Sequence, residues 1–304
     1  MSDRAFFLIG FEDSPMTLFG FALVIAAAFC HAAWNYFVKK IDGGPELVWL
    51  FSVISVFLYL PFALYIFLSA PAFLTPETAG FMIGSALLHL AYFLLLQQGY
   101  RRGDLSLVYP TARATGPFLA TVFAVLLGED ITLQVIAGGA AVILGVLGLT
   151  GTRTPAAKGN SATNPAASVA FGLGAGILIA SYTVWDAYTV AVLLVPPLML
   201  DYTSSLCRAM VLAPVALKRR QQVKDQLRRF PGSVLAIAFF NPLAYILVLY
   251  ALTFTPVVLV APLRETSVLI TVLMGSLLLG EGHLKHRLKW AVVILGGISL
   301  LATA

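Results

Sequence analysis

Residues 107–129 read LVYPTARATGPFLATVFAVLLGE, and residues 259–281 read LVAPLRETSVLITVLMGSLLLGE, a similar pattern 152 positions later. Each stretch carries a proline near its start, Pro110 or Pro262, and ends on Leu-Leu-Gly-Glu, at Glu129 or Glu281. Apolar segments share leucines by chance, but they rarely share a proline and a Gly-Glu end at the same separation. The chain is therefore predicted to contain two copies of one unit.

The same comparison, with slips of one residue, extends the match over both halves. It pairs Trp34-Asn35 with Trp185-Asp186 and Ala91-Tyr92 with Ala244-Tyr245. We predict a first unit at residues 1–149 and a second at residues 166–304. Residues 150–165 between them are rich in Thr, Ala, Gly, Asn and Pro, which predicts a flexible linker.

The composition indicates a membrane protein. The 304 residues are 60% hydrophobic and 11% charged, against roughly 25% charged in a soluble domain. A transmembrane helix needs about 20 mostly apolar residues. We therefore predict an all-α membrane protein with ten transmembrane helices, five in each unit. Their windows are Leu18–Val38, Val48–Leu68, Ala79–Gly99, Leu107–Leu127, Ile131–Leu149, Ala166–Val190, Pro196–Leu217, Gly232–Thr253, Val257–Leu279 and Leu288–Leu301.

The order of the windows and the basic residues predict how the chain enters the bilayer. Because five is odd, the two units would cross the membrane in opposite directions, as inverted repeats. Basic residues concentrate in cytoplasmic loops. We therefore expect the odd connections in the cytoplasm and both termini outside, with Arg4 the single basic residue there. The basic residues of the odd connections are Lys39, Lys40, Arg101, Arg102, Arg153, Lys158, Lys218, Arg219, Arg220, Lys224, Arg228, Arg229, Lys285, Arg287 and Lys289.

With these features the sequence resembles the EamA-like branch of the drug/metabolite transporter superfamily over essentially the whole chain. The resemblance rests on the two five-helix halves, the aromatic-polar pairs, the prolines and the Leu-Leu-Gly-Glu ends quoted above. Arg208 before Pro214 resembles the second helix of such a half, whereas the first half has Ser55 at that place. The resemblance implies a secondary transporter, often an exporter of amino acids, related metabolites or drugs. Members commonly keep their termini in the cytoplasm, which is opposite to the charge pattern.

Polar residues within the apolar windows predict one central cavity. His31 and Asn35 are four residues apart, as are Tyr182 and Asp186, so each pair shares a helix face. The repeat superposes the two pairs, and we expect them to meet between the units. The alternative is that such residues only bond between helices. Further candidates for the cavity wall are His89 with Tyr92, Asn241 with Tyr245, and Trp34 and Trp185 for stacking on a ligand.

Charged residues inside spans are costly, so they need a partner or a function. Arg113 and Glu265 are repeat equivalents, and Arg264 lies beside Glu265. An arginine suits a substrate carboxylate, and the glutamate suits an amino group or an exchanged proton. The alternative is a structural ion pair of Glu265 with one arginine.

The remaining features narrow the class of function. Cys30 and Cys207 lie in apolar stretches without ligand spacing, which predicts core thiols and no metal or other cofactor. HExxH and GxSxG motifs are missing, so the chain is not predicted to be an enzyme, although a membrane enzyme or a sensor stays the alternative to a transporter. The expected partners are the lipid bilayer, a small-molecule substrate and protons, but not nucleic acid. A monomer would suffice, and a dimer is compatible with the sequence.

Overall fold

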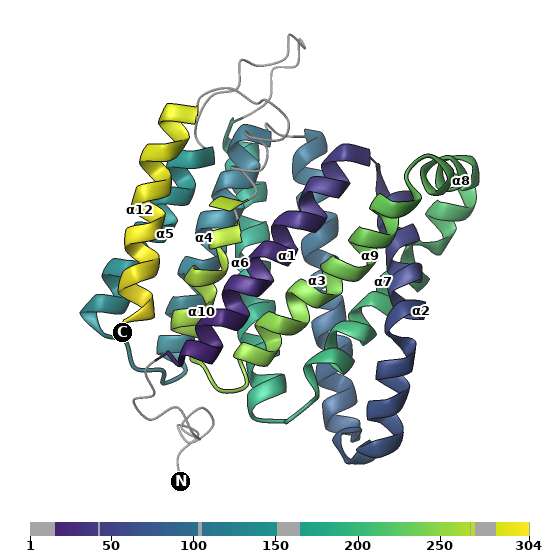
Figure 1. The fold of residues 1–304 in the computed structure, drawn as a ribbon, viewed down its shortest axis with the longest axis horizontal. Coiled ribbons are helices and arrows are strands. Elements are labelled where there is room, and N and C mark those ends of the chain that lie inside the picture. The colour runs from purple at the N-terminus through teal and green to yellow at the C-terminus, as the bar shows by residue number, and fades with distance from the viewer. Residues whose placement is uncertain are drawn as a thin grey trace.

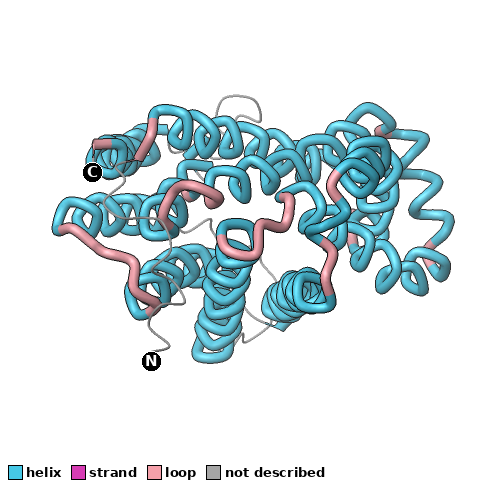
Figure 2. Tube along the Cα trace, turned by 90° about the horizontal axis from the view of Figure 1, so that it is seen from below, coloured by secondary structure: helices cyan, strands magenta, loops and turns pink. Residues whose placement is uncertain are grey.

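The structure is a computed structural model, in which residues 16–41, 43–102, 105–150, 165–267, 269–270 and 284–303 are described. Within these residues it is helical and has no strand. Figure 2 shows helices joined by short loops. In chain order the elements are α1 (Leu18–Ile41), α2 (Pro45–Ser69), the short 3-10 helix η2 (Pro71–Phe73), α3 (Pro76–Arg102), α4 (Leu105–Leu126), α5 (Leu133–Thr150), α6 (Pro165–Ala191), α7 (Pro197–Lys218), α8 (Arg220–Arg229), α9 (Pro231–Ala251), α10 (Val257–Arg264) and α12 (Leu284–Ala302).

Helices lie in the windows that the sequence predicts. In the ninth window, α10 covers the first part. Five segments are long and apolar enough to cross a bilayer. Several large apolar side chains point outward, as for Phe57, Phe62 and Tyr65 on α2, which are 69%, 61% and 72% exposed. The chain is thus an all-helical, multi-pass membrane protein. The five segments are Leu18–Val38, Pro45–Ser69, Pro76–Leu96, Ala166–Ala191 and Pro231–Ala251, and shorter apolar helices cover Thr111–Leu126, Leu133–Gly148 and Val292–Leu301.

The first half of the chain packs mainly against the second (Figure 1). α1 lies along α9, and α6 lies against α3 and α4. α2 packs on α7, and α5 packs on α12. In the sequence repeat, α6 is the counterpart of α1 and α9 is the counterpart of α3. The helix pairs follow this repeat, because replacing each helix by its counterpart changes the pair α1 and α9 into the pair α6 and α3. The same exchange leaves the pairs α2 with α7 and α5 with α12 unchanged.

Two glycines allow α6 to approach α4 closely. A Cβ atom at Gly172 would lie 2.6 Å from Thr111 Cβ, and one at Gly176 would lie 2.5 Å from Thr115 Cβ. Small residues four positions apart commonly let membrane helices pack backbone against backbone. This close contact places the polar middle of α6 beside α4.

Prolines begin several of the helices. A proline stands at the first position of α2, α3, α6, α7 and α9, and it lacks the N–H that the first helical turn leaves unpaired.

One helix is additional to the predicted windows. The basic connection after α7 folds into the short helix α8, which packs on α2, α7 and α9 at one end of the bundle (Figure 1). The sequence predicts this segment only as a basic cytoplasmic connection.

Candidate functional site

A buried carboxylate stands at the meeting point of α3, α6 and α9. The Asp186 side chain is 0% exposed, and its Oδ2 lies 3.0 Å from His89 Nε2. The hydroxyl of Tyr245 donates a short hydrogen bond to the same oxygen. One oxygen thus receives two donors from two other helices, one of them in the other half of the chain. Such charge-assisted bonds are the stronger kind in proteins.

Aromatic rings pack against one another beside this carboxylate. The imidazole of His89 stacks on Tyr182, with 4.0 Å between ring centroids, and meets Tyr245 edge to face at 5.1 Å. Tyr92 contacts Tyr182 edge to face at 5.8 Å. We call His89, Tyr92, Tyr182, Asp186 and Tyr245 the Asp186 cluster. The faces of aromatic rings attract cations, so the cluster combines two features that favour a positively charged group.

The second oxygen of Asp186 has no hydrogen-bond partner among the described residues. This atom, Oδ1, is buried away from solvent. Oε2 of Glu265 is also buried and also has no hydrogen-bond partner among the described residues. A buried polar atom without a partner costs free energy, so native proteins rarely leave one. Each of these oxygens can therefore accept a bond from a ligand, a water molecule or its own proton.

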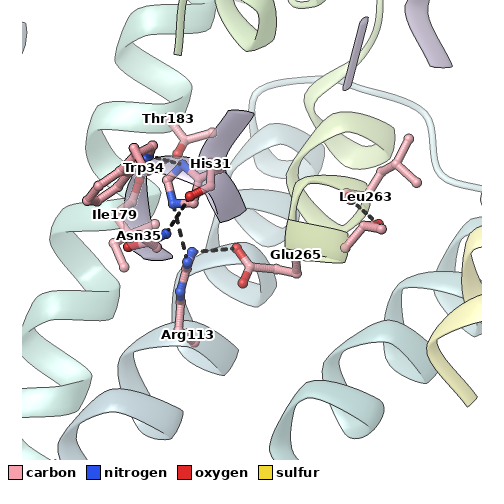
Figure 3. Close-up of polar contacts among 9 residues, drawn as sticks. His31, Trp34, Asn35, Arg113, Ile179, Thr183, Leu263 and Glu265 are labelled. Atoms are coloured by element: carbon pink, nitrogen blue, oxygen red, sulfur yellow. Dashed lines mark hydrogen bonds and ion pairs between the residues drawn. The ribbon is translucent and has the colours of Figure 1, made fainter. Parts of the chain in front are cut away.

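A second group of polar residues joins α1, α4 and α10 (Figure 3). Nη1 of Arg113 donates to Oε1 of Glu265 over 3.2 Å, with side chains that are 15% and 1% exposed. Nη2 of Arg113 lies 3.5 Å from Nε2 of His31. Arg264 immediately precedes Glu265 at the end of α10. We call His31, Arg113, Arg264 and Glu265 the Arg113 cluster.

The α1 residues of this region also bond to one another. The indole N–H of Trp34 donates to Nδ1 of His31 over 3.2 Å, and the amide of Asn35 donates to the His31 carbonyl over 2.8 Å. Both Trp34 and Arg113 are donors only, and a neutral imidazole can accept from just one of them. The shorter bond, from Trp34, makes Nδ1 the acceptor. Trp34 and Asn35 thus orient His31 within α1.

Tyr182 connects the two clusters. It belongs to the Asp186 cluster, and it also lies within electrostatic range of Arg113, Arg264 and Glu265. The predicted stripes on α1 and α6 therefore lie in one region. They do not bond to each other there, because Asn35 bonds to its own helix while Asp186 bonds to α3 and α9.

Two of the predicted residues lie apart from both clusters in the described part of the chain. The indole N–H of Trp185 donates to the carbonyl of Phe81 over 2.9 Å, and its ring stacks on that of Phe81 at 4.5 Å. This contact ties α6 to α3. Asn241 lies on α9, one turn before Tyr245, and joins neither cluster.

α7 carries a polar row that was not predicted as part of the site, although Arg208 stood out in the sequence. Ser205 donates to Asp201 over 3.4 Å, and Arg208 donates to Ser205 over 3.0 Å. Asp201 is 6% exposed and lies within electrostatic range of His89 and Asp186. A signal was available, because an aspartate and an arginine seven residues apart in one apolar window share a helix face.

Glu129 links the turn after α4 to the other half of the chain. Its two carboxylate oxygens accept from the backbone N–H groups of Val257 and Val258, each over 3.0 Å, at the start of α10. A carboxylate at a helix N-terminus satisfies unpaired donors and complements the helix dipole. Burial nevertheless raises the pKa of Glu129 above its usual range. Its repeat equivalent Glu281 lies outside the described residues, as do Arg4 and most of the predicted linker.

The remaining predictions concern metals and cysteines. The described residues contain no group of three His, Cys, Asp or Glu side chains that could hold a metal ion. Cys30 and Cys207, predicted as core thiols, are free thiols of intermediate burial.

Comparisons with known proteins complete the description of the site. A family model described as the EamA-like transporter family matches this chain twice, over residues 18–151 and 166–303. A solved structure titled only "Crystal structure of protein" aligns with a TM-score of 0.72 and 14% sequence identity, over 92% of this chain and 95% of that one. This likeness concerns the fold alone. A search of curated proteins found no match.

Proposed function

Because the chain belongs to the EamA-like transporter family, we propose that it is a secondary transporter that exports a small metabolite by alternating access. The membrane is the bacterial inner membrane, both termini face outward, and the ten spans form two inverted five-helix repeats. The exchange of helix partners between the halves supports this arrangement. In it the two repeats rock about a site that they share, which opens to each side in turn.

The charges of the two clusters support a zwitterionic substrate. With its histidine neutral, the Arg113 cluster holds two arginines and one glutamate, and thus one surplus positive charge. With its histidine also neutral, the Asp186 cluster holds one negative charge, beside packed aromatic rings. Tyr182 lies within electrostatic range of both. The carboxylate of an amino acid or a related metabolite would bind beside Arg113 and Arg264, and its ammonium would bind Asp186.

The observation that carries this proposal is the unpartnered Oδ1 of Asp186. It is fully buried, and it belongs to a carboxylate whose other oxygen already accepts two bonds. A substrate ammonium supplies both the charge and the donor that this oxygen lacks. A drug-like organic cation is the second candidate, because it needs only Asp186 and the rings.

Counterflow into proteoliposomes tests the proposal. Vesicles loaded with one compound should accumulate its labelled form, and a panel should contain amino acids, their decarboxylated amines and organic cations. We expect exchange of amino acids and a loss of exchange in Asp186→Asn, whereas the surface control Asp225→Asn should behave as wild type. If amines and organic cations exchange but amino acids do not, the substrate is a cation and not a zwitterion. Binding of panel members without any counterflow would favour a sensor instead.

A further inference from the structure

The outer face of α8 carries a row of basic side chains. Arg220, Lys224 and Arg228 recur every four residues, so they lie along one side of the helix. All three are exposed, and none forms an ion pair among the described residues. Leu227 lies beside them and is 43% exposed. We call Arg220, Lys224, Leu227 and Arg228 the α8 stripe.

Contacts on the inner face fix which side of α8 points outward. Arg219, just before the helix, donates to Glu46 over 2.9 Å, and Gln226 donates to the same carboxylate over 3.2 Å. Val223 packs against the apolar cluster that contains Leu47. Glu46 therefore pairs with Arg219 and not with the stripe, and Asp225 of the same helix accepts from Gln221 over 3.2 Å.

The stripe lies at the level where the bilayer meets water. α8 directly precedes the apolar span Pro231–Ala251, and it contacts the first turn of the span Pro45–Ser69 through Glu46. In Figure 1, α8 is seen nearly end-on at one end of the bundle, while α2 runs down the picture. The helix thus crosses the direction of its neighbours at the end of two spans. Headgroups of the surrounding lipids occupy this level.

We propose that the α8 stripe binds the phosphodiester headgroup of an anionic phospholipid. Three exposed cations that form no ion pair among the described residues attract negative lipids. Positions 220 and 228 lie about 12 Å apart along the helix, so the stripe can hold more than one phosphate. The exposed Leu227 favours a lipid over a soluble anion, because its side chain can enter the apolar layer below the headgroups. The site holds α8 to the membrane surface, and it does not depend on the identity of the transported substrate.

Native mass spectrometry of the full chain in detergent micelles tests the site. The purified protein is titrated with phosphatidylglycerol or with phosphatidylcholine, and the bound lipids are counted. We expect tighter binding of phosphatidylglycerol by the wild type, and at least about a tenfold weaker affinity in the triple variant Arg220→Gln, Lys224→Gln, Arg228→Gln. The matched control Lys40→Gln, Lys218→Gln, Arg229→Gln removes as many exposed charges, and its affinity should stay near that of the wild type.

Two further measurements keep the result decisive. The pair Arg220→Lys and Arg228→Lys conserves charge and should retain the lipid, which separates loss of binding from loss of structure. Leu227→Gln should weaken lipid binding, and inositol hexakisphosphate should not displace the lipid. The proposal would be overturned by unchanged binding in the triple variant, by an equal loss in the matched control, or by displacement with the soluble polyanion.

Discussion

Arg113 and Glu265 occupy equivalent positions in the two repeats, 152 residues apart, and their side chains form an ion pair with 3.2 Å between Nη1 and Oε1. The pair joins α4 to the end of α10. Because one residue is basic and the other acidic, the two repeats differ in charge at this contact.

The first prediction concerns this ion pair. Glu265→Gln removes the buried carboxylate to which Arg113 donates, and breaking a buried ion pair typically costs about 3–5 kcal/mol. If the pair is structural, the thermal unfolding temperature should fall in Glu265→Gln, and the double variant Glu265→Gln, Arg113→Gln should recover much of the loss. Thermal unfolding of the four proteins in detergent measures this coupling.

A functional role for Glu265 predicts a different result. If Glu265 exchanges a proton, Glu265→Gln should fold as the wild type does and still perform counterflow, but it should lose the dependence of net flux on a pH gradient. A double variant with Arg264→Gln in place of Arg113→Gln shows which of the two arginines is energetically coupled to Glu265. Stability, exchange and pH dependence all equal to wild type in Glu265→Gln would contradict both roles.

The helices, and several of the polar residues that meet between them, could be predicted because both depend on simple rules. Long apolar runs bounded by prolines predict spanning helices, and the costs of burying His89, Arg113 and Asp186 single them out. The repeat then indicated that Arg113 and Glu265 are equivalent. Family membership, which the comparisons confirm, followed from the same pattern.

The partners of these residues could not be predicted, because they depend on how the helices rotate and tilt against each other. Asp186 was expected to meet the α1 stripe, yet it bonds to His89 and Tyr245. Trp185 was a candidate for ligand stacking, but Phe81 holds its indole. Helical spacing tells which residues share a face and leaves open which neighbouring helix that face meets.

The second prediction concerns the bonds to Asp186. Tyr245→Phe removes one hydrogen bond to a charged group, which is worth about 1.5–3 kcal/mol, and it leaves the ring in place. We expect a lower unfolding temperature and weaker substrate binding. Tyr250→Phe is a matched control, because Tyr250 lies on the same helix and is 47% exposed. Equal effects of the two substitutions would show that the Tyr245 hydroxyl has no special role.

The third prediction concerns the carboxylate at the start of α10. Glu129→Ala leaves the N–H groups of Val257 and Val258 without their acceptor, and loss of such a cap costs about 0.5–2 kcal/mol. We expect a lower unfolding temperature in this variant. Asp130→Ala, in the neighbouring exposed position, serves as the control. A loss of the same size in Asp130→Ala would assign the effect to the turn instead of the cap.

The raised pKa of Glu129 adds a pH dependence to the same site. Burial favours the protonated form, so the folded protein holds this proton more tightly than the unfolded chain does. The stability from this group is present below the unfolded pKa and is lost as the pH rises through the folded pKa. As the pH increases, the unfolding temperature of the wild type should therefore fall relative to that of Glu129→Gln. A difference that does not change with pH would contradict the effect of burial.

The last prediction concerns orientation, which rests on the positions of the basic residues. With the native cysteines replaced, Ser69→Cys at the end of α2 and Gln222→Cys in α8 place single thiols at exposed sites in two different connections. A reagent that cannot cross the membrane should label Ser69→Cys in intact cells and should label Gln222→Cys only after the cells are opened. Both variants should react fully in detergent, which controls for buried thiols. The reverse pattern would place the basic connections outside and both termini in the cytoplasm, because the two sites lie in connections that an odd number of spans separates.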